Sequence, residues 1–301
     1  MTASASAPER ILQRLDWQVI RRLDGLLQGD YRSLFHGHGV DFADLREYQY
    51  GDDVRYIDWS VTARMDTPYV REYVEDREIT AWFLLDLSPS VDFGTADSER
   101  LKRGVLVDFV TTLARLLTRH GNRVGAVFYG GEVGQTIPAR GGRIQVLRLV
   151  NDLLRQPRLA TAPFTDLTPL LEAAQHSMKG RSLVFVISDF ISAPGWERPL
   201  NLLTQRHEVM AVRLFDRREV ELPDVGPLLM EDAETGEQLY VDTGDPGFRR
   251  RFEAAAEDRE AAIGEAFRRA GVDAVSLSTD EDLVRAIVRM AALRRRRRRV
   301  S

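Results

Sequence analysis

Oxygen-bearing side chains directly follow one apolar run of this sequence. The run 82–85 ends in Asp86, and Ser88 and Ser90 follow at the second and fourth positions after that aspartate. Carboxylate and hydroxyl oxygens are hard ligands of the kind that Mg²⁺ prefers in proteins. The D-x-S-x-S spacing therefore indicates a divalent-cation site, provided that the fold brings further oxygen atoms to the same place.

A second apolar run, 183–187, is followed by Ser188 and Asp189. Ligands of open α/β sheets sit at the carboxyl ends of parallel strands. We therefore expect Asp86 and Asp189 to flank one crevice if the two strands are neighbours. The loop before another helix offers the hydroxyls of Thr165 and Thr168, and either can supply a further ligand.

Both apolar runs have the length and composition of strands that are buried on two faces of a parallel sheet. From residue 79 onward strand and helix patterns alternate, which is typical of βαβ units. Further strands are expected at 123–129, 209–215 and 272–277, and helices at 101–116, 144–154, 167–178, 199–205, 248–270 and 280–293. The sequence thus predicts an α/β fold over residues 77–293, with a doubly wound, mostly parallel sheet flanked by helices. Residues 219–245 are expected to insert a hairpin at an edge of that sheet.

The first 76 residues are interpreted as a separate N-terminal segment. Residues 10–27 carry apolar side chains at helical spacing, and 31–41 indicate a loop rich in Gly and His. Residues 45–59 mix aromatic side chains with charges of both signs. This stretch is either a docking surface with aromatic and Arg anchors or an ion-pair network that fastens the segment to the main domain.

Composition narrows the class of protein. The 301 residues are 44% hydrophobic, and 42 Lys and Arg against 46 Asp and Glu give a net charge of −4, so the whole molecule is not a polyanion binder. Without cysteine, disulfides, thiolate metal sites and thiol nucleophiles are excluded. No apolar run approaches the ~20 residues of a membrane span, and residues 1–10 lack the apolar core of a signal peptide. We therefore expect a cytoplasmic protein.

Six consecutive arginines occupy positions 294–299, shortly before the last residue of the sequence. Residues 294–301 are interpreted as a basic tail, which either contacts nucleic acid or acidic lipid or is simply solvated and disordered. The stretch contains no interleaved aromatic residues, and nucleic acid is not the expected partner of this chain.

Several motifs together match those of a known family. The run from Asp86 to Ser90 matches the D-x-S-x-S of a metal-ion-dependent adhesion site, Asp189 matches its later aspartate, and Thr165 aligns with the threonine of a G-G-T-(D/N)-L loop. Residues 51–59, GDDVRYIDW, resemble the signature of the DUF58 family itself. The chain is therefore similar to DUF58 proteins with a von Willebrand factor A (vWA) domain, a group associated with MoxR-type AAA+ ATPases.

That resemblance implies a vWA fold and a site for Mg²⁺, or for Mn²⁺ or Ca²⁺. Its five implied ligands are Asp86, Ser88, Ser90, Thr165 and Asp189. One departure from the family pattern is that Pro163-Phe164 stands where two glycines are usual, so Thr168 stays an alternative to Thr165.

The expected function is that of a non-enzymatic adaptor. The metal site would bind a carboxylate of a partner, and the protein would work with a MoxR-like ATPase in the assembly or activation of an unidentified client complex. One alternative is a Mg²⁺-dependent phosphohydrolase, although Ser88 stands where such an enzyme needs a second aspartate as acid or base. The other alternative is nucleic-acid binding through the arginine tail.

Overall fold

The computed structural model describes residues 6–26, 37–94, 101–159, 162 and 164–300. The chain divides into two compact units, one of residues 1–28 and 80–301 and the other of residues 29–79. This division differs from the expected N-terminal segment 1–76, because it groups the N-terminal helices with the sheet and separates them from the charged stretch.

The larger unit contains a six-stranded sheet with the strand order β10-β7-β6-β3-β4-β5. Neighbouring strands run parallel, except that β5 is antiparallel to β4. The strands are β3 (Thr80–Asp86), β4 (Arg123–Tyr129), β5 (Val133–Arg140), β6 (Leu183–Ser188), β7 (Glu208–Phe215) and β10 (Asp273–Ser278). Counted within this sheet the order is 3-2-1-4-5-6, that of a doubly wound α/β fold. The predicted fold class is confirmed.

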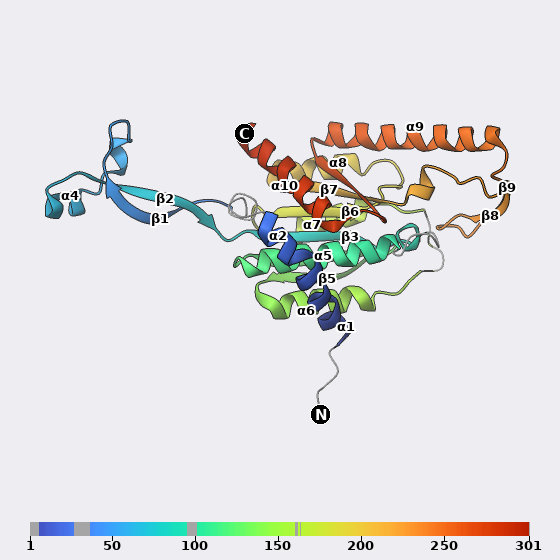
Figure 1. The fold of residues 1–301 in the computed structure, drawn as a ribbon, viewed down its shortest axis with the longest axis horizontal. Helices are drawn as coiled ribbons and strands as arrows, with labels where there is room; N and C mark the ends of the chain where they lie inside the picture. The colour runs from blue at the N-terminus through green and yellow to red at the C-terminus, as the bar shows by residue number, and fades with distance from the viewer. Residues whose placement is uncertain (1–5, 27–36, 95–100, 160–161, 163, 301) are drawn as a thin grey trace, which may run out of the picture. The chain divides into compact units, whose positions relative to one another are not determined.

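The two central strands are buried on both faces, as their continuous apolar composition predicts. Side chains of successive residues point to opposite faces of a sheet. Trp82 and Leu84 belong to a core that β3 shares with the helices α7 (Thr168–Ser177), α8 (Glu197–Arg206) and α9 (Pro246–Ala270). On the intervening position, Phe83 stacks on Phe185 of β6 with ring centroids 5.5 Å apart. Helices therefore cover the sheet on both sides, with α5 (Lys102–Arg119) and α6 (Gly142–Arg155) opposite α8 and α9 in Figure 1.

The helices of this unit follow the predicted periodicity closely. They are α1 (Ala7–Leu15), which continues through a π-helical turn (Asp16–Ile20) into α2 (Arg21–Leu26), then α5 (Lys102–Arg119), α6 (Gly142–Arg155), α7 (Thr168–Ser177), α8 (Glu197–Arg206), α9 (Pro246–Ala270) and α10 (Leu283–Val300). Among the described residues, none of these helices combines the length and the apolarity that crossing a bilayer requires.

The expected edge hairpin exists but does not extend the main sheet. Strands β8 (Pro227–Glu231) and β9 (Gln238–Asp242) pair antiparallel with each other and form a sheet of their own. Both ends of the six-stranded sheet are instead β5 and β10. The polar stretch between two apolar segments predicted the two paired strands correctly, but it carries no information about which other strand they join.

The interpretation of residues 294–301 as a solvated basic tail is wrong for its first part. Helix α10 continues to Val300, and Arg294 is only 5% exposed. The Arg294 guanidinium donates to both carboxylate oxygens of Glu208 at the start of β7. Because all six residues of the run are arginines, the sequence does not distinguish Arg294, which lies on the inward face of the helix, from the arginines that follow it.

The smaller unit is built on an antiparallel pair, β1 (Gly37–Glu47) and β2 (Tyr69–Arg77), joined through a 3₁₀ turn (Val54–Tyr56) and α4 (Trp59–Met65). The expected loop at 31–41 is wrong from Gly37 onward, because backbone pairing with β2 makes that part a strand. Residues 31–36 lie outside the described residues.

The charges of residues 45–59 are paired largely within this unit. Ion pairs join Arg46 to Asp52 and Arg55 to Asp53, and Asp58 pairs with Arg71 of β2. These contacts stabilise the segment itself, and both interpretations of the stretch, a docking surface or a network that fastens it to the main domain, stay predictions. Large side chains of this unit are exposed, namely Tyr50, Val54, Tyr56, Trp59 and Met65.

Candidate metal centre

The sheet changes direction of winding between β3 and β6, which are adjacent but separated by nearly one hundred residues in the sequence. Ligands of doubly wound sheets bind beyond the carboxyl ends of the strands at this point. Asp86 is the last residue of β3, and Asp189 directly follows β6. The structure therefore brings the two predicted aspartates to the place where the topology opens a crevice.

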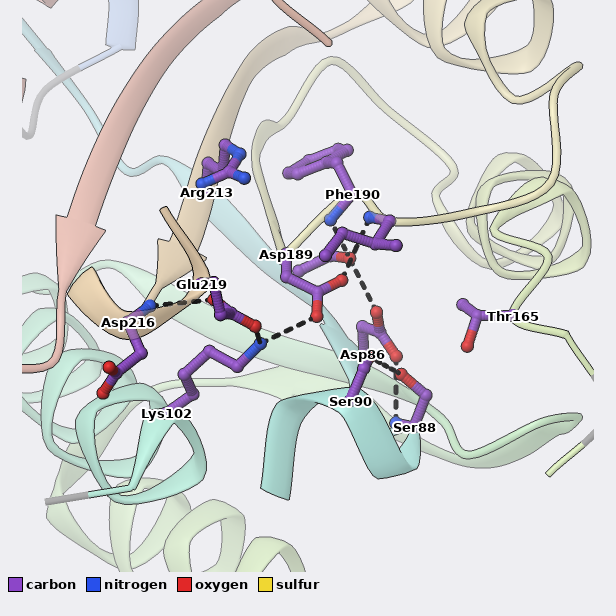
Figure 2. Close-up of polar contacts among 12 residues, drawn as sticks. Asp86, Ser88, Ser90, Lys102, Thr165, Asp189, Phe190, Arg213, Asp216 and Glu219 are labelled. Carbon is purple, nitrogen blue, oxygen red and sulfur yellow. Dashed lines mark hydrogen bonds and ion pairs between the residues drawn. The ribbon is translucent and has the colours of Figure 1, made fainter. Parts of the chain in front are cut away.

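The loop after β3 folds back so that its hydroxyls gather beside Asp86 (Figure 2). The Ser88 backbone N–H donates to Asp86 Oδ1 at 3.0 Å, and a 3₁₀ turn over Pro89–Asp92 follows. The Oγ atoms of Ser88 and Ser90 then lie 3.2 Å apart. The Ser188 hydroxyl donates to Asp86 Oδ2 at 2.6 Å, which ties the ends of the two strands together.

Asp189 is held from both sides. Its Oδ1 accepts from the backbone N–H of Ile191 at 3.1 Å, and its Oδ2 accepts from Lys102 Nζ at 3.0 Å. The next residue, Phe190, adopts a left-handed conformation with φ of 56°, which is costly for a bulky side chain. Its ring packs against Trp196 and Phe267 with centroids 5.3 and 4.7 Å away, and this aromatic cluster holds the strained backbone in place.

Lys102 is a member of this site that the sequence did not reveal. It is the first residue of α5, its side chain is fully buried, and its Nζ also lies 2.7 Å from Glu219 Oε1. Figure 2 shows Lys102 reaching between Glu219 and Asp189. A lysine at the start of an amphipathic helix is usually solvated. Helix α5 is buried along most of its length, Arg103 and Asp108 included. The spacing of its apolar residues in the sequence does not show this burial.

Burial and neighbouring charges shift the acidities of these groups. Burial, together with the charge of Asp189, raises the pKa of Asp86 to about 6. Burial acts in the same direction on Asp189, but the Lys102 ammonium, together with hydrogen bonds from the Ile191 N–H and from Ser90, offsets it and holds the pKa of Asp189 below its ordinary value. Burial disfavours the charged form of Lys102, yet the carboxylates of Asp189 and Glu219 raise its pKa overall.

Thr165 lies at the same edge of the sheet and is 1% exposed. Its carbonyl oxygen accepts from the Ala193 N–H at 2.8 Å, which places its loop beside the segment that follows Asp189. Thr168 instead begins α7, where its N–H donates to Asp166 Oδ1. Pro163, one of the two residues that replace the usual glycines, lies outside the described residues.

A second residue that the sequence did not place here is Glu234, from the turn between β8 and β9. Its carboxylate accepts from the Thr165 hydroxyl at 2.6 Å and from the Thr165 N–H at 3.0 Å. The hairpin was predicted, but nothing in the sequence pattern indicated that its turn returns to the carboxyl ends of the main strands.

The chemistry of these donors fits a hard divalent cation. The single ammonium of Lys102 is shared by two carboxylates, Asp189 and Glu219, and Asp86 adds a third carboxylate beside Asp189, so the buried charges here remain negative in sum. The five proposed ligands comprise the two carboxylates of Asp86 and Asp189 and the three hydroxyls of Ser88, Ser90 and Thr165. Among the described residues, no group of three or more His, Cys, Asp or Glu side chains could hold a metal ion by itself. Any cation here therefore depends on the serine and threonine oxygens as well.

Comparison with known proteins places the chain in a family. Residues 44–262 match the family described as "Protein of unknown function DUF58". An uncharacterized protein of Mycobacterium tuberculosis is 38% identical over 285 residues, which cover 95% of this chain and 89% of that protein.

Two solved structures are similar at low identity. BatB from Bacteroides thetaiotaomicron is 14% identical with a TM-score of 0.47, covering 72% of this chain and 98% of that one. An aerotolerance-related membrane protein from Bacteroides fragilis is 13% identical with a TM-score of 0.48, covering 73% and 99%. The family match spans most of the chain and the mycobacterial relative nearly all of it, so this protein belongs to the DUF58 family.

Proposed function

We propose that this protein is a non-enzymatic adaptor that binds a carboxylate of a partner protein through a divalent cation. The observation that supports this most directly is the meeting of Asp86 and Asp189, both fully buried, beside three hydroxyls at the switch point of the sheet. Buried carboxylates are costly without a counter-charge. Since Lys102 lies against Asp189 and not against Asp86, a cation near Asp86 would supply the missing positive charge.

Each of the proposed ligands would have a distinct role in binding the cation. Mg²⁺, or Mn²⁺ or Ca²⁺ in its place, would supply an electrophilic centre able to accept one more oxygen ligand. Ser88, Ser90 and Thr165 would offer neutral oxygens, and Asp86 and Asp189 the negative charge. A ligand set with so few formal charges leaves the ion attractive to an external carboxylate.

The partners follow from the family resemblance of the sequence. We propose a MoxR-like AAA+ ATPase and a client complex that the two proteins assemble or activate together, in the cytoplasm. A co-purification from the native organism, with and without EDTA, tests the partner: the ATPase should be recovered only when the divalent cation is present.

The cation site itself is tested by thermal unfolding with and without Mg²⁺ or Mn²⁺. An ion that binds the native state alone stabilises it by about 2.7 kcal/mol when its free concentration is a hundred times the dissociation constant. We expect this stabilisation in the wild type and its loss in Asp86→Asn.

The matched control is Asp216→Asn. Asp216 is also a buried aspartate at a strand end, but it accepts from Thr279 and from the Arg218 N–H and is not a proposed ligand. This variant should keep the full metal response, whatever its own stability. If neither the wild type nor the control responds, the cation mechanism is wrong.

The two alternatives have less support. For phosphoryl transfer, the position two residues after Asp86 holds Ser88, whose Oγ lies beside Ser90 and cannot act as a carboxylate acid or base. For nucleic acid, the arginine run begins with a residue whose charge is already paired with Glu208.

A further inference from the structure

The turn between β8 and β9 presents a carboxylate to the proposed cation site. Both oxygens of Glu234 are bound by one residue, since Oε1 accepts from the Thr165 hydroxyl at 2.6 Å and Oε2 from the Thr165 N–H at 3.0 Å. Thr165 is buried, whereas Glu234 is partly exposed. The chain itself therefore delivers to this site the chemical group that the proposed partner would supply.

The turn is shaped in a way that fixes this presentation. Asp232 Oδ1 accepts from the N–H of Glu234 at 3.0 Å, and from the N–H and hydroxyl of Thr235 at 2.8 and 3.0 Å. The carbonyl oxygen of Glu234 accepts from the Ala162 N–H at 3.1 Å, on the segment that precedes Thr165. The carboxylate is thus aimed at Thr165 by several contacts of its own turn.

The hairpin that carries Glu234 gains no support from pairing with other described strands. Its strands have five residues each and pair only with one another in the described part of the chain, and an isolated two-stranded hairpin is marginally stable. Leu229, Leu239 and Tyr240 are more than half exposed.

A cavity of about 620 Å³ adjoins the hairpin. The loop after Asp86 contributes Pro89 and Phe93 to its wall, and the hairpin and the residues leading into it contribute Leu222, Val225, Leu228 and Met230. A segment that borders a cavity has few packing contacts to lose when it moves, and such segments open at low free-energy cost.

We propose that Glu234 is a tethered competitor that occupies the carboxylate position of the cation site, and that a partner's Asp or Glu must displace it. The inference rests on the proposed function, because it assigns a regulator to the same site. A ligand that binds only the open form has an apparent affinity reduced by the fraction of protein that is open. The stability of the β8–β9 hairpin in its closed position therefore sets how tightly a partner's carboxylate must bind in order to replace Glu234.

The test uses Mn²⁺ as the probe and acetate as the simplest external carboxylate. Water-proton relaxation reports the water molecules on bound Mn²⁺, and acetate that enters the site replaces water and lowers the signal. We compare the wild type with Glu234→Gln, which keeps the shape of the side chain and removes its charge. Glu237→Gln, an exposed glutamate of the same turn, is the control, and chloride holds the ionic strength constant.

Glu234→Gln should take up acetate with an apparent affinity at least about tenfold higher than the wild type, while Glu237→Gln should behave as the wild type. Asp232→Ala loosens the turn but leaves Glu234 intact, so it should shift acetate binding in the same direction by a smaller factor. Circular dichroism verifies that each variant is folded.

The opposite result is equally clear. If Glu234→Gln weakens Mn²⁺ binding and leaves the acetate titration unchanged, Glu234 orients Thr165 and does not compete with a partner, and the inference is overturned. If Mn²⁺ binds neither the wild type nor any variant, the proposed cation site fails and takes this inference with it. Mn²⁺ binding with identical acetate curves in all variants refutes the competitor alone.

Discussion

Lys102 illustrates how much one buried charge can contribute to this fold. Its Nζ lies between Asp189 and Glu219, and its side chain has no exposed surface. Removing one partner of a buried ion pair leaves an uncompensated charge and costs about 3–5 kcal/mol. We expect Lys102→Met to lower the free energy of unfolding by this amount in urea denaturation with EDTA present.

Two further variants separate charge from packing in that measurement. Lys179→Met removes an exposed lysine and should change the free energy of unfolding by less than about 0.5 kcal/mol. Lys102→Met combined with Asp189→Asn removes both charges of one pair and should recover part of the loss. Equal effects of Lys102→Met and Lys179→Met would contradict the ion-pair account.

At the scale of residues, the sequence predicted the convergence of the two aspartates but not the residues that surround them. Asp86 and Asp189 were found because each follows an apolar strand, and strand ends of a parallel sheet converge. Lys102 and Glu234 reach the same place from the start of a helix and from a turn. Their positions depend on how distant elements pack, and neither periodicity nor turn chemistry specifies that.

At the scale of elements, the Arg294–Glu208 ion pair fastens helix α10 to β7. Side-chain exposure is 6% for Arg294 and 26% for Glu208, so water screens the pair in part. We expect Arg294→Ala to destabilise the protein by about 1–3 kcal/mol, below the range for fully buried pairs. Arg296→Ala, an exposed position two residues further along the same helix, is the matched control and should have little effect in urea unfolding.

Measuring duplex-DNA binding by the same two α10 variants tests the alternative of nucleic-acid binding. If the run 294–299 binds polyanions as a free tail, Arg294→Ala and Arg296→Ala should weaken binding to duplex DNA equally at low salt. A helical tail with Arg294 buried predicts that only Arg296→Ala lowers any such affinity.

The elements themselves were largely predictable because most are local patterns. Strands β3 and β6 are continuous apolar runs, and α5 and α9 show clear helical spacing. Strand β1 was missed, since its Gly- and His-rich start has the composition of a loop and becomes a strand through pairing with β2. Pairing partners more than twenty residues away are not visible in a single sequence.

The division of the whole molecule into two units leads to a prediction about deletion. Gly37 and Arg77 are paired at the first and last residues of β1 and β2, and directly paired residues of antiparallel strands have Cα atoms about 5 Å apart. A linker of four Gly and Ser residues can therefore replace residues 38–76. We expect the shortened chain to unfold cooperatively, with a midpoint within about 4 °C of the full protein.

Differential scanning calorimetry measures this directly. The shortened chain should also keep the metal-dependent stabilisation of the full protein, because all proposed ligands belong to the larger unit. A broad transition without a heat-capacity peak would mean that residues 38–76 are needed to complete the fold of the sheet.

The positive charge that Lys102 supplies within the chain also bears on whether folding must wait for metal binding. Proteins whose buried acids depend on an ion alone remain unfolded until metal is supplied. Here an ammonium already lies against Asp189, so we expect the chain to fold without metal and the proposed cation to bind afterwards. Chelation should then abolish the proposed partner binding without unfolding the protein, so that scarcity of metal would act reversibly.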